Sequence, residues 1–242
     1  MEKIEKLEMP NTDKNCFAEE KASFVDVAIY TQGKVLVDMQ YAKQGRAGAI
    51  TVAYLRKEAA DRLLHAATFL PKGYAFKIFD AWRPYAVQKS LYDEYFEKVK
   101  AETPTLTEEE WHAKAKTFVS FPDKSKKFAY VHSSGGAVDL TVVDERGREL
   151  DMGTGFDDFS PLAATCALEE REWDNEAKEN RRILYHAMTK AGFTNYPAEW
   201  WHYDYGDIFW GAMTGKAVKY PSVYTKEEMI LELGNHVGTV KI

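Results

Sequence analysis

Two segments of the sequence carry histidine and carboxylate side chains at spacings that suit a metal ion. His132 stands before a Gly-Gly turn and Asp139 follows it, so the chain can fold back and bring the imidazole and the carboxylate together. His202 lies close behind a second carboxylate, Glu199. Two imidazoles, one carboxylate and an open fourth position are the usual ligand set of a catalytic zinc ion. A further carboxylate beside that position can act as general base, so the sequence predicts a metal site that activates water.

The elements that must position these residues follow from the apolar patterns. The patterns predict two short strands joined by a tight turn over 24–39, a strand over 74–79, a hairpin over 130–147 and a strand or an irregular β segment over 196–205. They predict helices over 55–70, 85–99 and 161–190, and a further helix that starts at a capping box at Thr107. No repeat and no Ser/Gly/Pro-rich linker divides the chain. We therefore expect a peripheral N-terminal extension over 1–22 and a single domain over 23–242. The expected class is α+β, a small and mainly antiparallel sheet with helices packed against it.

Four motifs, in this order along the chain, carry a resemblance to a known family. They are Asp80-Ala81-Trp82-Arg83-Pro84, then H-x-x-G-x-A-x-D from His132 to Asp139, then Met152-Gly153-Thr154-Gly155-Phe156-Asp157, and E-x-W-H from Glu199 to His202. Together they resemble the zinc peptidases of the D-alanyl-D-alanine carboxypeptidase and hedgehog-like superfamily. The first and third motifs narrow the resemblance to the D-Ala-D-Ala dipeptidase (VanX-type) branch. The resemblance covers roughly residues 35–210 and implies a hedgehog/D,D-peptidase-like zinc peptidase fold.

The resemblance also implies roles for the side chains that do the chemistry. His132, Asp139 and His202 correspond to the ligands of one zinc ion per chain. Glu199 corresponds to the general base and Arg83 to the guanidinium that stabilises the oxyanion. Zinc lowers the pKa of its bound water toward ~7, so that Glu199 can accept a proton and pass it to the leaving amine. The implied activity is zinc-dependent hydrolysis of D-Ala-D-Ala or a similar small D,D-dipeptide.

Three further residues are expected in the substrate pocket. Asp157 matches an acidic residue that meets the substrate's ammonium, and Tyr41 stands where the family has a pocket tyrosine. Tyr130 occupies a position where the family usually has serine, and the usual Asn-Phe-x-Gly after the pocket tyrosine is missing from 43–48. Both departures concern the substrate pocket and leave the metal residues unchanged, so they bear on specificity and not on hydrolysis.

Alternatives remain open at this point. A D,D-carboxypeptidase or an L,D/D,D-endopeptidase acting on longer peptidoglycan peptides would use the same metal residues. A catalytically silent, zinc-stabilised binding module is an alternative from another class, which the presence of Glu199 and Arg83 disfavours. Residues 109–112 also match E-x-W-H, although they precede the other metal residues. Arg83 alone could be a structural partner of Asp80, and Asp157 alone could favour a helix dipole.

The composition argues against several classes of protein. The 242 residues carry a net charge of −6 with no basic run, which disfavours nucleic acid and an anionic membrane as partners. With 45% hydrophobic and 14% aromatic residues the chain is not disordered, and no apolar stretch is long enough for a membrane span. The charged start predicts a cytoplasmic protein, or an exported one if a signal peptide has been removed. Cys16 and Cys166 fit no metal or redox spacing and are expected to be ordinary thiols.

Overall fold

The structure, a computed structural model, describes residues 1–20, 22–171 and 175–233. Its strands are β1 (Phe24–Asp26), β2 (Leu36–Val37), β3 (Tyr54–Arg56), β4 (Ala75–Asp80), β5 (Ala137–Val143), β6 (Thr194–Asn195) and β7 (His202–Asp204). Five of them form one sheet in the order β2-β4-β5-β7-β6, and β1 pairs with β3 in a second, two-stranded sheet. Neighbouring strands are antiparallel except for the parallel pair β2–β4. The expected α+β class with a small, mainly antiparallel sheet is confirmed.

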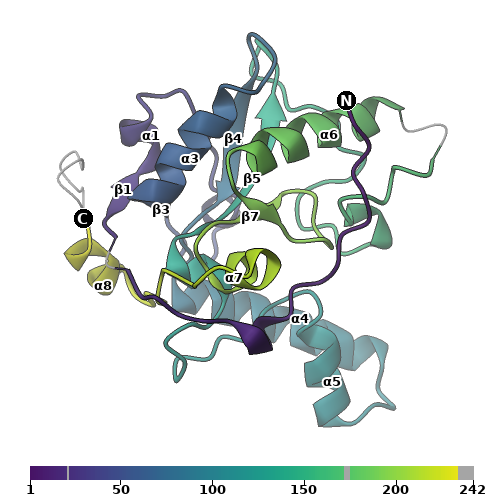
Figure 1. Cartoon of the computed structure of the whole chain (residues 1–242). Helices are drawn as coiled ribbons and strands as arrows, with labels where there is room; N and C mark the ends of the chain where they lie inside the picture. The colour runs from purple at the N-terminus through teal and green to yellow at the C-terminus, as the bar shows by residue number, and fades with distance from the viewer. Residues whose placement is uncertain (21, 172–174, 234–242) are drawn as a thin grey trace.

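Helices cover the sheet and connect its strands (Figure 1). The α-helices are α1 (Val27–Tyr30), α2 (Gln40–Lys43), α3 (Lys57–Ala67), α4 (Tyr85–Glu102), α5 (Glu108–Ala115), α6 (Asn175–Lys190), α7 (Ile208–Thr214) and α8 (Lys226–Leu231). The 3-10 helices are η1 (Thr12–Lys14), η2 (Val131–Ser134) and η3 (Pro161–Ala163). Within the described ranges, no helix combines the length and the apolar character needed to cross a bilayer.

The main core lies between the large sheet and helices α3 and α6. Val138, Leu140 and Val142 of β5 belong to this core together with Leu63 of α3 and Leu184 of α6. Because successive side chains of a strand point to opposite faces, the residues between them face away from α3 and α6. The side of the sheet opposite this core is therefore where β5 presents its polar residues.

The N-terminal segment runs over the surface from beside α6, past α7, toward α8 (Figure 1). Ile4 is buried, and its backbone N–H donates to Glu169 Oε1 at 3.0 Å. The Ala18 N–H donates to the Val218 carbonyl at 2.9 Å. These contacts hold the segment against the rest of the chain. The division into an extension over 1–22 and a domain over 23–242 stays a prediction. Cys16 and Cys166 are both free thiols.

Several predicted elements are confirmed. Helix α3 lies inside 55–70, strand β4 follows the pattern over 74–79, and α4 begins directly after Pro84. Thr107 and Glu110 form the predicted capping box at the start of α5. The β segment predicted over 196–205 is shorter than expected, because only β7 forms within it and β6 precedes it.

The predicted strand pair over 24–39 is wrong. The turn at Gln32 and Gly33 exists, with φ of 54° and 74°, but β1 and β2 belong to different sheets. Asp26 ends β1 by accepting a hydrogen bond from the Ile29 N–H at 3.2 Å, which caps helix α1. The local cap therefore turns the chain before a hairpin can form.

The predicted helix over 161–190 and the hairpin over 130–147 also need correction. Among the described residues of the first segment only η3 and α6 are helical, and residues 172–174 lie outside the described part of the chain. The buried Arg181 side chain donates to the carbonyls of Leu162 and Ala164 at 2.8 Å, which holds that stretch as turns. In the second, the turn after β5 forms, but the returning chain makes a single bridge, Val143 to Glu149. Strands β4 and β7 occupy the two edges of β5 instead.

Candidate active site

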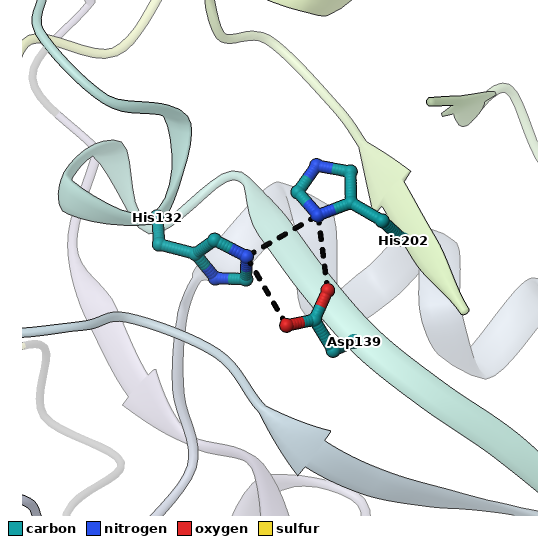
Figure 2. Close-up of side chains that lie close together, drawn as sticks. All are labelled: His132, Asp139 and His202. Carbon is teal, nitrogen blue, oxygen red and sulfur yellow. Dashed lines mark hydrogen bonds and ion pairs between the residues drawn. The ribbon is translucent and has the colours of Figure 1, made fainter. Parts of the chain in front are cut away.

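His132, Asp139 and His202 point toward one another from η2, β5 and β7 (Figure 2). The His132 Nε2 atom lies 3.3 Å from Asp139 Oδ2 and 3.3 Å from His202 Nδ1. The His202 Nδ1 atom lies 2.9 Å from Asp139 Oδ1. All three side chains are buried, so the sequence-predicted trio converges on one point.

The strand register places the carboxylate and one imidazole side by side. Asp139 of β5 is directly opposite His202 of β7, and opposite residues of an antiparallel pair share a face. Tyr203 belongs to the main core, so His202 faces the other side of the sheet. On the opposite edge of β5, Asp139 is paired with Asp80 through a register shift after Ile78. This bulge turns Asp80 toward the same face as Asp139.

A tight turn delivers His132 to the end of β5. Gly135 has φ of 75°, and a Cβ atom at this position would lie 2.1 Å from the Phe24 ring, so a larger residue does not fit. The His132 Nδ1 atom lies 2.7 Å from the Ala81 carbonyl, which can only accept a hydrogen bond. The proton therefore sits on Nδ1, and Nε2 is left with its lone pair toward Asp139.

His202 is held from its outer side by a carboxylate. Its Nε2 atom lies 2.7 Å from Asp204 Oδ1, and Asp204 is buried. Burial lowers the pKa of His202, but Asp204 and Asp139 outweigh burial and raise that pKa well above its ordinary value. Burial and Asp204 together raise the pKa of Asp207, which caps α7, well above the usual range of a carboxyl.

The donor set fits a zinc ion. Zinc–nitrogen and zinc–oxygen bonds of ~2.0–2.2 Å in a tetrahedron put neighbouring ligand atoms about 3.3–3.6 Å apart. The three separations above are 2.9–3.3 Å, and the ligand atoms lie within 4.8 Å of one another. Three protein ligands leave a fourth position free, as in catalytic zinc sites.

Glu199 lies next to this group in the turn that leads into β7. Its Oε2 atom is 3.9 Å from His202 Nδ1, and the side chain is largely buried. The Glu199 N–H donates to the Tyr196 carbonyl at 3.0 Å, and the Asn195 Nδ2 amide donates to the Glu199 carbonyl at 3.0 Å. Burial is the main reason that the pKa of Glu199 rises to about 8. The structure thus places a buried carboxyl group with a raised pKa beside the three potential ligands.

Arg83 lies between the metal group and a buried hydrogen-bond network. Its Nε atom donates to Asp80 Oδ2 at 2.7 Å and its Nη1 atom to Gln88 Oε1 at 2.8 Å. The remaining nitrogen, Nη2, lies 3.4 Å from Asp139 Oδ2 and 3.5 Å from the Tyr41 hydroxyl. The structural pairing with Asp80 therefore exists, and it leaves one guanidinium nitrogen facing the metal group.

A cavity of about 420 Å³ opens on these residues and is also lined by the predicted pocket residues Tyr41, Tyr130 and Asp157. The Tyr41 hydroxyl donates to Asp157 Oδ1 at 3.2 Å, and burial raises the pKa of Asp157 to about 7. Asp158, and not Asp157, accepts the local turn bond from the Ser160 N–H at 2.7 Å. The Tyr130 hydroxyl donates to the Arg83 carbonyl at 3.0 Å, so this tyrosine supports the backbone of Arg83.

The second E-x-W-H segment, residues 109–112, takes no part in the metal group. In the described chain His132, Asp139 and His202 form the one group of potential ligands. His112 lies in α5, where its Nδ1 atom is 2.7 Å from the Tyr92 hydroxyl and its ring stacks on Phe96. It is an aromatic packing residue.

Comparison with known proteins shows the family of this chain. The profile of a family described as D-Ala-D-Ala dipeptidase matches residues 20–223. The chain is 30% identical over 183 residues to a D-alanyl-D-alanine dipeptidase of Synechocystis sp., covering 69% of this chain and 73% of the relative. It is 29% identical over 157 residues to a D-alanyl-D-alanine dipeptidase of Enterococcus faecalis, covering 64% and 71%. The chain belongs to the D-Ala-D-Ala dipeptidase family.

Membership of the D-Ala-D-Ala dipeptidase family makes the chain a peptidase and confirms the resemblance that its four motifs carry. A solved structure of the vancomycin resistance D,D-pentapeptidase VanY, a mutant in complex with Zn(II), aligns with a TM-score of 0.42 at 17% identity. That alignment covers 91% of this chain and 99% of VanY.

Sequence reasoning missed three side chains that complete the site of this family member. The sequence suggests Asp80 as a partner of Arg83 but not as a neighbour of Asp139, because the bulge that turns it toward Asp139 leaves no mark in the sequence. Gln88 fixes Arg83 from the first turns of α4. Asp204 could have been predicted from the sequence, because residues two positions apart on a strand share a face and Asp204 follows His202 by two.

Proposed function

We propose that the chain is a zinc-dependent dipeptidase that hydrolyses D-Ala-D-Ala or a similar small D,D-dipeptide. The observation that carries this proposal is the convergence of His132, Asp139 and His202, with Glu199 beside them and one cavity open to all four. The names of the two relatives support D-alanyl-D-alanine as the substrate. The donor set of two imidazoles and one carboxylate supports zinc.

The residues around the ligands have complementary tasks in hydrolysis. Zinc held by His132, Asp139 and His202 would act as a Lewis acid and lower the pKa of a bound water toward ~7. Glu199 accepts a proton from the attacking water and delivers it to the leaving amine, because its carboxylate lies on the cavity beside the ligands. Arg83 Nη2 donates to the developing oxyanion, and the loss of such a donor costs ~2.7–4 kcal/mol in comparable sites.

The amino end of the substrate would be held by Asp157. This carboxyl lies in the cavity with Tyr41 as its hydrogen-bond donor, and burial raises its pKa to about 7. An ammonium group beside it favours the ionised form, because an opposite charge offsets the desolvation of the carboxylate. A free dipeptide carries that ammonium, whereas an acylated peptide does not.

The test compares substrates on the zinc-loaded protein. We expect hydrolysis of D-Ala-D-Ala, little hydrolysis of L-Ala-L-Ala, and little hydrolysis of an N-acylated tripeptide that ends in D-Ala-D-Ala. Removal of zinc with a chelator should abolish turnover, and zinc should restore it. A zinc-loaded protein that binds these peptides without cleaving any of them would instead be a binding module, and the proposal would be wrong.

A second candidate function is hydrolysis of longer peptidoglycan peptides by a D,D-carboxypeptidase or an endopeptidase. The size of the cavity favours it, since about 420 Å³ falls in the range of ~300–1,000 Å³ that accommodates drug-sized ligands. The cavity also extends from the ligands to Tyr95 and Lys98 of α4 and to Phe118. Comparable turnover of D-Ala-D-Ala and of the acylated tripeptide would favour this candidate over the dipeptidase.

A further inference from the structure

Asp204 lies behind the imidazole of His202, on the side away from the cavity. The two residues share one face of β7, a strand that is paired on both edges with β5 and β6. Asp204 Oδ1 is 2.7 Å from His202 Nε2, and the residue is 1% exposed. The opposite ring nitrogen, Nδ1, is the atom that faces Asp139 and His132.

The partners of Asp204 differ from those of a structural carboxylate. A buried structural carboxylate is normally satisfied by several N–H groups, because an unpaired buried charge is costly. Asp207 shows that pattern at one oxygen, since its Oδ1 atom accepts from the backbone N–H groups of Phe209 and Trp210 at the start of α7, although its Oδ2 atom has no hydrogen-bond partner among the described residues. In the described chain Asp204 Oδ1 meets His202, while Asp204 Oδ2 has no hydrogen-bond partner.

The other imidazole of the group is held in a different way. The outer nitrogen of His132 faces the Ala81 carbonyl at 2.7 Å, which is a neutral acceptor. A carboxylate behind an imidazole fixes the proton on the outer nitrogen, orients the ring and makes the inner nitrogen a stronger donor to a metal. Asp80 Oδ2 lies 3.7 Å from the same His132 nitrogen, whereas Asp204 Oδ1 lies 2.7 Å from His202 Nε2. Of the two imidazoles, His202 is therefore the one whose outer nitrogen has a carboxylate within hydrogen-bond distance.

We propose that Asp204 is a positioning residue for the metal site, which keeps the Nε2 proton of His202 and directs its Nδ1 lone pair toward Asp139 and His132. This inference rests on the metal site of the proposed function. It adds a role that Asp204 performs through another residue, because Asp204 does not line the cavity. A divalent cation bound to His202 makes the Nε2–H group of the ring a stronger donor to Asp204, which offsets the cost of burying the carboxylate.

The experiment measures metal affinity and coordination apart from activity. Zinc dissociation constants are obtained by competition with a chromogenic chelator for wild type, Asp204→Ala and Asp204→Asn, and Co(II) absorption spectra report the ligand geometry. Removal of such a carboxylate weakens metal binding by about 10–100-fold, which we expect for Asp204→Ala with an altered Co(II) spectrum. Asp204→Asn should lose less, because its amide oxygen still accepts from Nε2.

Glu58→Gln is the matched control, because Glu58 is also a hydrogen-bonded carboxylate that contacts the chain next to Asp204. It accepts from the Tyr205 hydroxyl at 2.5 Å and from Lys219 Nζ at 2.8 Å. We expect this variant to lower the melting temperature of the protein and to leave zinc affinity unchanged. If both variants lost zinc affinity in proportion to the drop in their melting temperatures, the role of Asp204 would be structural only.

The outcomes separate this inference from the proposed function. A wild-type protein that binds no zinc would refute the metal site itself. A wild type that binds zinc, with Asp204→Ala binding it equally well, would overturn the role of Asp204 alone. If Asp204→Ala does not fold, the test uses Asp204→Asn alone. A wild-type zinc affinity and an unchanged Co(II) spectrum in Asp204→Asn would overturn the inference.

Discussion

The substitution Glu199→Gln tests the chemistry most directly. Glutamine keeps the size of the side chain and its oxygen but cannot accept a proton from water at neutral pH. Glu199 lies 3.9 Å from His202 Nδ1, outside the trio of ligand atoms. The variant should therefore bind zinc as wild type does and lose hydrolysis.

The expected loss follows from which other carboxylates could replace Glu199. A general base contributes about 10²–10⁴-fold to the rate, or ~2.7–5.5 kcal/mol. Asp139 is committed to the metal group and Asp80 to Arg83, while Asp157 accepts from Tyr41. Because no unengaged carboxylate stands beside these ligands in the described chain, we expect the upper part of this range, about 10³–10⁴-fold in kcat.

The assay is steady-state hydrolysis of D-Ala-D-Ala at pH 7.5 by wild type and variant, each with its zinc content measured on the same sample. His202→Ala serves as the comparison, since it should lose zinc and activity together. A Glu199→Gln protein that retains zinc and turns over within threefold of wild type would refute the base assignment. Loss of zinc in Glu199→Gln would instead make Glu199 a ligand.

Two further predictions concern the residues around the ligands. Arg83→Lys keeps the positive charge but loses the hydrogen bonds to Asp80 at 2.7 Å and to Gln88 at 2.8 Å. We therefore expect kcat to fall about 10²–10³-fold while zinc affinity stays unchanged. A rise in KM alone would contradict a role of Arg83 in the transition state. Asp157 has a pKa of about 7 in the folded metal-free protein, above the ~3.8 of an unfolded chain. Between about pH 4 and 7 the folded protein therefore holds a proton on Asp157 that the unfolded chain has lost. The free energy of unfolding should fall as the pH rises through this range. Asp157→Asn should make this fall smaller in urea titrations, since Glu199, with a pKa of about 8, also contributes to it. The variant should also lose the preference for free over acylated dipeptides. An unchanged pH dependence would show that the Asp157 carboxyl is solvated.

The sequence determined the chemistry of this protein more fully than its topology. The candidate ligands, their order and the candidate base could be predicted because each belongs to a short motif, and the structure brings His132, Asp139, His202 and Glu199 together. Local signals also determined the helices that begin at Pro84 and at Thr107, since a proline and a capping box act within a few residues.

Only the tertiary structure decided how those motifs meet. The pairing of β5 with β4 and β7 joins residues far apart in the chain, and this register puts Asp139 opposite both His202 and Asp80. The bulge at Asp80 depends on that pairing, and so does the burial that raises the pKa of Glu199. Strand pairing and burial are properties of packed surfaces, so the positions of Asp80 and of the cavity follow from contacts that no local pattern encodes.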